Sequence, residues 1–369
     1  MKKILILILI VRASAYAQVS VPFTSDQWTF ANEGHTLETF QGKACLTLKQ
    51  NRAMLKDLSF ENGILEYDVA FPHERDFIGI QFRTEDEGNY EEFYLRPHQS
   101  GNPDANQYSP VYGTVSGWQL YNGEGYGVAT NYPYNEWIHV KLAISGRYMD
   151  VFINDMNTPA MFCELKRSVR PGYISFQDAL GEAYLANFTY TSTGQEKITL
   201  KGSPKASVAA AEGTCLAWDV SSPFPEKNLD KITSLKSTDK AGLTWTTGQA
   251  ENTGTVNLAM YNAYTPEKNT VFCRVVVESD RDQVKKFQFG FSDHVRVFFN
   301  DNLMFSGEDS FQTRDYRFLG TIGYFDAVYF PLKKGKNEII FAVSEIFGGW
   351  GVRGRFEDSS GIRIGTGKK

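Results

Sequence analysis

The sequence predicts an all-β protein built from two antiparallel β-sandwich (jelly-roll) domains. Aromatic and β-branched residues alternate with polar ones over most of the chain, which is the period-two pattern of half-buried strands. Gly, Asn and Asp interrupt this alternation at short intervals, as turns between antiparallel strands do. No segment with the periodicity of an ordinary helix competes with this pattern. A chain of 369 residues also exceeds what one hydrophobic core usually organises, so two cores are expected.

The chain begins with the features of a secretory signal peptide. Lys2 and Lys3 precede an apolar run, and a small-residue cleavage site follows, with cleavage expected after Ala17. No later segment has the roughly 18 apolar residues that cross a bilayer. The mature protein is therefore expected to be secreted or periplasmic, without membrane insertion. The expected organisation is 1–17 signal peptide, 18–194 first sandwich, 195–212 linker and 213–369 second sandwich.

Each sandwich is expected to contain many short strands. In the first, the alternation places strands at 44–49, 63–71, 77–83, 90–96, 117–121, 137–145, 148–153, 161–165 and 172–177. In the second, it places them at 216–220, 270–278, 286–291, 295–299, 327–331, 338–344 and 352–356. Between them, the linker is rich in Ser, Thr, Gly, Lys and Ala, which suits an exposed connection.

The charge pattern argues against a nucleic-acid partner, and the cysteines limit which disulfides and metal sites are expected. The net charge of −5 has acids and bases interspersed, so no basic stripe is available for nucleic acid. The four cysteines permit one disulfide per domain, and burial as four apolar thiols is equally consistent with their wide spacing. They lack a C-x-x-C metal signature. They are Cys45 and Cys163 in the first half, and Cys215 and Cys273 in the second.

One strand presents two contrasting rows of side chains. Phe93 and Leu95 are expected to face the core, so Glu92, Tyr94 and Arg96 face outward. An antiparallel sheet often leaves one face wet, so a polar row alone is not decisive. This row, however, contains an aromatic ring and a bidentate-capable Arg, and it runs into an expected long loop, 98–118, dense in amide, hydroxyl and aromatic groups.

Three runs, 60–71, 77–83 and 137–153, resemble the concanavalin A-like lectin/glucanase superfamily, including laminin-G-like domains, over about residues 20–193. That resemblance implies a concave sheet that presents a groove to sugars. The segments 287–305 and 330–341 resemble galactose-binding-like jelly-roll modules. Two aromatic segments of the second half, 315–326 and 347–351, could shape a second site or the interface with the first sandwich, and the core or the interface is expected.

Carbohydrates present hydroxyl pairs and apolar C–H faces, so planar polar groups beside aromatic rings suit them. Trp118 is equally consistent with a core position. The residues expected to bind the glycan are Gln81, Arg83, Glu92, Tyr94, Arg96, His98, Asn102, Asp104, Gln107, Tyr108 and Trp118.

Catalysis is an alternative. The laminarinase-type motif Glu-x-Asp-x-(x)-Glu begins at Glu66 and Asp68, but its second Glu is absent. A carboxyl pair could still form if the strand of Glu66 or Asp68 lay beside that of Glu92, with His98 as acid or base. A looser resemblance to exported hydrolases of the 3-keto-disaccharide type supports the same alternative. Serine-hydrolase elbows, zinc-protease motifs and phosphate loops are absent.

The leading hypothesis is therefore an exported protein that binds an oligo- or polysaccharide on the concave sheet and the 98–118 loop of the first sandwich. A glycoside hydrolase with a cross-strand carboxyl pair and a protein-binding scaffold are the alternatives. No organic cofactor is expected. A structural Ca²⁺, common in sandwiches of this kind, is neither indicated nor excluded by the sequence.

Overall fold

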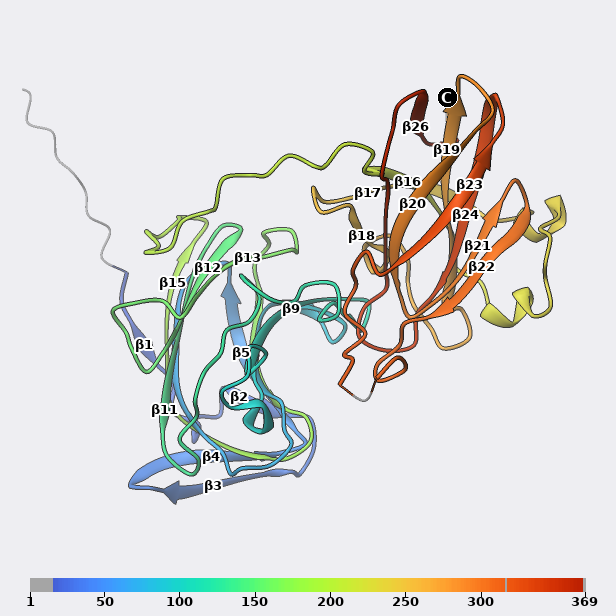
Figure 1. The fold of residues 1–369 in the computed structure, drawn as a ribbon. Coiled ribbons are helices and arrows are strands. Elements are labelled where there is room, and N and C mark those ends of the chain that lie inside the picture. The colour runs from blue at the N-terminus through green and yellow to red at the C-terminus, as the bar shows by residue number, and fades with distance from the viewer. Residues whose placement is uncertain (1–15, 316, 368–369) are drawn as a thin grey trace, which may run out of the picture.

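The computed structural model describes residues 16–315 and 317–367, and it is all β, as predicted (Figure 1). Its strands form four sheets in which every pairing is antiparallel, and the sheets stack in pairs as two sandwiches. Within the described residues the helical elements are short 3₁₀ helices. They are η1 (Pro97–Gln99), η2 (Glu226–Leu229), η3 (Ser237–Lys240) and η4 (Leu258–Met260).

The first sandwich stacks an 8-stranded sheet, sheet A, on a 7-stranded sheet, sheet B. Sheet A consists, in spatial order, of β13 (Met161–Glu164), β12 (Tyr148–Ile153), β11 (Ile138–Ser145), β6 (Asn62–Ala70), β15 (Glu182–Gly194), β4 (Lys43–Lys49) and β3 (His35–Phe40), with β1 (Val19–Ser20) paired to β15. Sheet B consists of β10 (Val115–Ser116), β9 (Asn106–Tyr112), β8 (Asn89–Leu95), β7 (Ile78–Asp86), β14 (Gly172–Asp178), β5 (Arg52–Phe60) and β2 (Trp28–Phe30).

The core between these sheets follows from the alternation of the strands. Leu65, Tyr67 and Val69 of β6 point inward from sheet A, and Ile80 and Phe93 do so from sheet B. Aromatic rings tie the layers together, since the rings of Tyr67 and Phe176 lie 4.9 Å apart at a near-perpendicular angle.

The second sandwich stacks a 7-stranded sheet, sheet D, on a 4-stranded sheet, sheet C. Sheet D runs β17 (Trp245–Gln249), β16 (Ala217–Ser221), β19 (Thr270–Ser279), β24 (Gly335–Ser344), β21 (His294–Phe299) and β22 (Asn302–Glu308), with β26 (Ile362–Gly365) paired to β19. Sheet C runs β18 (Thr255–Asn257), β25 (Gly351–Phe356), β20 (Gln283–Ser292) and β23 (Asp326–Leu332).

Trp218 and Trp350 are fully buried in the second sandwich. The outer face of sheet D also carries an apolar cluster. Phe224, Leu229 and Leu235 come from a segment that contains η2 and η3, and they pack on Phe272 and Phe298 of the sheet. Figure 1 shows this segment in yellow, standing beside β21 and β22. Sheet D is therefore partly covered on the side that faces away from its main core.

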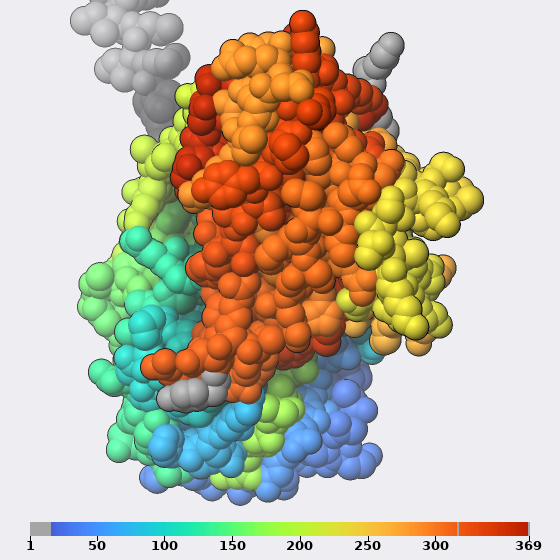
Figure 2. Space-filling model, turned by 45° about the vertical axis from the view of Figure 1, so that its right-hand side comes forward, coloured from blue at the N-terminus to red at the C-terminus, as the bar shows by residue number. Residues whose placement is uncertain are grey.

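A turn of the first sandwich penetrates the second. Gln119 is fully buried; its amide accepts a hydrogen bond from Ser292 Oγ (2.8 Å) and donates one to the carbonyl of Leu319 (3.0 Å). Its backbone N–H donates to the carbonyl of Gly348 at 2.9 Å. Gly348 has φ of 102°, and a Cβ there would lie 2.6 Å from the Gln119 amide carbon, so this contact requires glycine. In Figure 2 the second sandwich rests directly against the first.

This contact shows where the aromatic segment 347–351 lies. Trp350 is a core residue, and Gly348 and Phe347 meet the first sandwich, as expected for the 347–351 segment. The expected strand 117–121, by contrast, is a turn, and the expected loop 98–118 contains β9 and β10. Both errors fall in the segment that docks between the sandwiches.

Residues 195–212 form no helix or strand and are mostly exposed. Whether the two sandwiches fold separately stays a prediction. The expected signal peptide falls almost wholly on residues 1–15, outside the described residues. In the part of the chain that is described, no helix is long and apolar enough to cross a membrane. All four cysteines are buried free thiols. The structure therefore agrees with the expectation of four apolar thiols and not with that of one disulfide per domain.

Candidate functional site

The outward face of sheet B is where sequence reasoning placed a glycan. The predicted phase of β8 is confirmed, because Phe93 and Leu95 lie in the core while Glu92 and Tyr94 lie on the opposite face. Glu92 stands opposite Gln81 of β7 and Ser109 of β9. Tyr94 stands opposite Gln107 of β9.

At the centre of this face, planar polar groups are joined to one another. The buried Gln81 amide donates to Gln177 Oε1 at 2.7 Å and to Glu92 Oε1 at 3.4 Å, and it accepts from Ser175 Oγ at 2.8 Å. Glu92 and Gln177 are only partly buried. Burial raises the pKa of the Glu92 carboxyl to about 7, although the hydrogen bond from Gln81 opposes the shift.

Towards β9, the same face is closed. Arg96 donates to Tyr94 Oη (2.9 Å), to Gln107 Oε1 (2.5 Å) and to the carbonyl of Asp104 (2.8 Å). Gln107 in turn donates to the carbonyls of Trp118 and Tyr121. Tyr94 and Arg96 are each 6% exposed. These side chains tie sheet B to the turn that docks on the second sandwich, which corrects the prediction that Tyr94, Arg96 and Gln107 are free to contact a glycan.

Two further predicted residues point away from this face. Arg83 has φ of 50° at a register irregularity between β7 and β8. Its guanidinium lies buried against the carbonyls of Glu61 and Gly146. Tyr108 is fully buried in the core. The expectation that both bind ligand is wrong: the bulge reorients Arg83, and Tyr108 occupies an inward position of a strand that was read as a loop.

The remaining predicted residues lie around the end of the face. His98 sits on η1, where its Nδ1 accepts from the backbone N–H of Asp76 at 3.4 Å; burial and nearby Arg residues lower its pKa. Asn102 is exposed and donates to Gln99. Asp104 and Trp118 line a pocket of about 30 Å³ between the sandwiches, which is room for about one water molecule. The Trp118 ring meets Phe311 and Phe347 of the second sandwich.

Glu66 and Asp68 are not neighbours of Glu92. They lie on β6 of sheet A, whereas Glu92 lies on β8 of sheet B, so the predicted cross-strand carboxyl pair is wrong. Both acids meet His139 on sheet A, at 3.6 Å from Glu66 and 2.7 Å from Asp68. Hydrogen bonds to Asp68 and Glu66 raise the pKa of His139 to about 9. Although burial acts in the other direction, hydrogen bonds, that from His139 first, lower the pKa of Asp68 to about 2.

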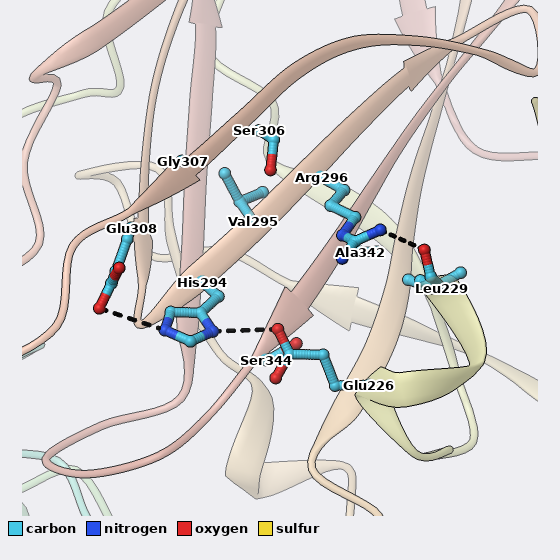
Figure 3. Close-up of a pocket in the computed structure, with 10 residues that line it drawn as sticks. All are labelled: Glu226, Leu229, His294, Val295, Arg296, Ser306, Gly307, Glu308, Ala342 and Ser344. Atoms are coloured by element: carbon cyan, nitrogen blue, oxygen red, sulfur yellow. Dashed lines mark hydrogen bonds and ion pairs between the residues drawn. The ribbon is translucent and has the colours of Figure 1, made fainter. Parts of the chain in front are cut away.

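Sequence reasoning missed a larger pocket on the outer face of sheet D, about 320 Å³ in volume (Figure 3). Its lining residues are Glu226, Leu229, His294, Val295, Arg296, Ser306, Gly307, Glu308, Ala342 and Ser344. The sequence did contain one indication of this pocket, because the polar residues His294, Arg296 and Ser306 interrupt the apolar runs of β21 and β22 at outward positions. Glu226 and Leu229, however, come from η2, about 70 residues earlier in the chain, and no local pattern connects them to these strands.

The charged groups of this pocket are paired. His294 lies between Glu226 (3.0 Å) and Glu308 (3.5 Å), as Figure 3 shows. The hydrogen bond to Glu226 raises the pKa of His294, and the same contact lowers the pKa of Glu226. Both partners therefore favour their charged forms.

Within the described ranges, no group of three or more His, Cys, Asp or Glu residues is arranged to hold a metal ion. Asp68 engages the side chains of Lys43 and His139, and Glu226 engages that of His294. Whether the protein binds a structural Ca²⁺ stays a prediction.

Comparison with known proteins is limited to fold. No protein-family model matches the chain, and no curated protein matches it. Among solved structures, it is similar to carbohydrate-binding module CBM66 from Bacillus subtilis, with 14% identity and a TM-score of 0.36 over 45% of this chain and 96% of that one. It is also similar to a Bacillus licheniformis β-glucanase, with 9% identity and a TM-score of 0.36 over 48% and 98% of the two chains. These likenesses assign neither a superfamily nor a function to the chain.

Proposed function

We propose that the protein is an exported carbohydrate-binding protein, and that its glycan site is the partly open Glu92–Gln81–Gln177 group on sheet B. One observation carries the proposal: these planar groups are held by one another on a face turned away from the core. A sheet face that merely meets water needs no such ordered amides. A desolvated carboxyl with a pKa near 7 is costly, and costly ionisable groups cluster at functional sites.

The group has unused hydrogen-bonding capacity on its open side. Gln81 engages Glu92 and Gln177 through one oxygen of each. In residues 16–315 and 317–367, neither Glu92 Oε2 nor the Gln177 amide nitrogen has a hydrogen-bond partner. One free acceptor beside one free donor suits two adjacent hydroxyls of a sugar ring, because each hydroxyl both donates and accepts.

Binding is favoured over hydrolysis by what surrounds Glu92. Glycosidases generally use two carboxyls on either side of the bond that they cleave. The outward positions beside Glu92 carry Gln81 on β7 and Gln107 and Ser109 on β9. Glu66 and Asp68 lie on the other sheet. Glu92 alone is suited to accept a hydroxyl hydrogen bond or to exchange a proton, and it lacks the second carboxyl that turnover needs.

The test is a glycan array together with a reducing-sugar assay, applied to the purified protein. We expect retention on at least one neutral glycan without release of reducing ends. Glu92→Gln and Gln177→Ala should each weaken binding roughly tenfold or more, since each removes a hydrogen bond made directly to the ligand. The matched control is Glu38→Gln on β3 of sheet A, which should bind like the parent.

Release of reducing ends would replace this proposal with the hydrolase alternative. No retention on any glycan would instead favour the protein-binding scaffold. Binding that survives both Glu92→Gln and Gln177→Ala would show that the glycan site lies elsewhere in the molecule.

A further inference from the structure

The pocket on the outer face of sheet D is built from four separate segments, and β24 contributes Ala342 and Ser344 to it. β21 directs His294 and Arg296 outward, β22 places Glu308 and Ser306 directly opposite them, and η2 brings Glu226 over the same face. Its volume of about 320 Å³ lies at the small end of the range for ligand pockets. We propose that it is a second binding site, for a neutral, hydroxyl-rich small molecule such as a single pyranose unit.

The charge pairing argues against an ionic ligand. Glu226 and Glu308 flank His294 at 3.0 and 3.5 Å, and the Arg296 guanidinium donates to the carbonyl of Leu229 and lies 3.7 Å from Asp230. An anion would be repelled by the two glutamates, and a cation would compete with His294 for them. A neutral ligand leaves these pairs intact and avoids the cost of unpaired charge.

The paired groups still have capacity for hydroxyls. A carboxylate offers about four acceptor positions and a guanidinium five donors, of which the existing contacts occupy only some. Ser306 has no side-chain hydrogen bond among the described residues, and it is exposed at the pocket. Leu229 and Ala342 add an apolar part to the lining. Donors, acceptors and a small apolar surface together match a sugar ring, whose hydroxyls surround C–H groups.

This site does not depend on the one proposed on sheet B. Glu92 belongs to the other sandwich and shares no lining residue with the pocket. The experiment can therefore report on the two sites separately. Leu229 and Ala342 both line the pocket and belong to the apolar cluster on the outer face of sheet D, so their methyl groups are local reporters in a protein labelled at Leu and Ala methyls.

The full protein would be titrated with the methyl pyranosides of glucose, galactose, mannose and xylose and with sorbitol, up to roughly 10 mM, which detects affinities near 1 mM. Glucosamine and glucuronic acid serve as charged counterparts. We expect saturable shifts of the Leu229 and Ala342 methyl signals with at least one neutral probe, and weaker or no shifts with the charged ones. Glu308→Gln and Ser306→Ala should weaken that binding about tenfold or more.

The control variants are Glu357→Gln, which follows β25 of the opposite sheet, and Glu92→Gln. Both should leave the shifts unchanged. The proposal is overturned if neither the Leu229 nor the Ala342 methyl signal moves with any neutral probe, or if only a charged probe moves them. It is also overturned if Glu308→Gln and Ser306→Ala, with melting temperatures like the parent, still bind normally, or if Glu92→Gln abolishes the shifts.

Discussion

Sheets B and D each turn a partly covered face with polar groups away from their main cores, but they differ in how that face is filled. On sheet B, Tyr94, Arg96 and Gln107 use their hydrogen-bonding groups on one another and on the docking turn. On sheet D, η2 and its neighbouring segment cover only part of the face and leave a pocket of about 320 Å³. Strand alternation decides which residues face outward. Distant segments decide whether those residues meet solvent.

The largest expected effect tests whether the side chains on both faces of β8 contribute to the stability of the fold. Phe93→Ala should lower the free energy of unfolding by about 3–5 kcal/mol, because it leaves a cavity in the core. Tyr94→Ala should lower it by about 2–3 kcal/mol, because the ring is 6% exposed and hydrogen-bonded to Arg96. Denaturant unfolding of both variants measures this. A loss below roughly 0.5 kcal/mol for Tyr94→Ala would mean that this part of sheet B is open, and the contrast with sheet D would disappear.

A matched pair of arginines compares the two faces directly. Arg96→Ala should cost about 2–4 kcal/mol, since it leaves Gln107 and the Asp104 carbonyl without their donor in a buried place. Arg296→Ala should cost about 1 kcal/mol or less, since its guanidinium is partly exposed at the rim of a pocket. The free energy of unfolding of each variant gives the answer. Equal costs would show that the sheet D face is as closed as that of sheet B.

The turn that accepts hydrogen bonds from Gln107 on sheet B also makes the contact between the sandwiches. Gln119→Ala should weaken this contact by about 1–3 kcal/mol, because Ser292 and the Leu319 carbonyl lose their partner in a buried place. Limited proteolysis of the parent should cut first in the exposed residues 195–212. The variant should be cut faster there. First cuts inside either sandwich would contradict the predicted boundary, and an unchanged rate in the variant would show that the Gln119 side chain does not hold the sandwiches together.

The sequence predicted the fold class and the phase of β8 because both depend on local alternation, which Phe93 and Leu95 obey. It did not predict the position of Arg83, because one bulge with a left-handed φ changes the direction of a side chain without a compositional signal. It paired Glu66 with Glu92 because both occupy outward positions. Which sheet a strand joins, however, is decided by pairings between residues far apart in sequence.

The candidate sites also depend on contacts between residues far apart in sequence, which local patterns do not predict. Glu92 and Gln81 were found from the pattern of their strands, but Gln177, which completes the group, lies 96 residues from Gln81. The sheet D pocket needs η2 to lie over β21, and the contact between His294 and Glu226 joins residues 68 positions apart. Patterns within one strand carry no information about such contacts.

The smallest expected effect concerns pH, which should change the contributions of Glu92 and Glu226 to stability in opposite directions. Burial raises the pKa of Glu92 from about 4.5 to about 7, so folding retains a proton that the unfolded chain releases. Its contribution to stability therefore falls as pH rises from 4.5 to 7. Glu226 has a lowered pKa through His294, so its contribution is present above pH 4.5 and is lost as pH falls through its folded value.

Glu92→Gln should accordingly be at least as stable as the parent at pH 7, with its largest relative gain above that pH and none below about pH 4. Glu226→Gln should be less stable than the parent near pH 6, where His294 retains its charge, and the difference should shrink on acidification. Melting temperatures measured across this range compare the two. Because both carboxyls are partly exposed, solvent screening keeps the differences in melting temperature small, and their sign is the informative result. If Glu92→Gln lost stability at pH 7, the carboxylate would be held in its charged form, and the sheet B group would be ionic, like the Glu226–His294 pair of sheet D.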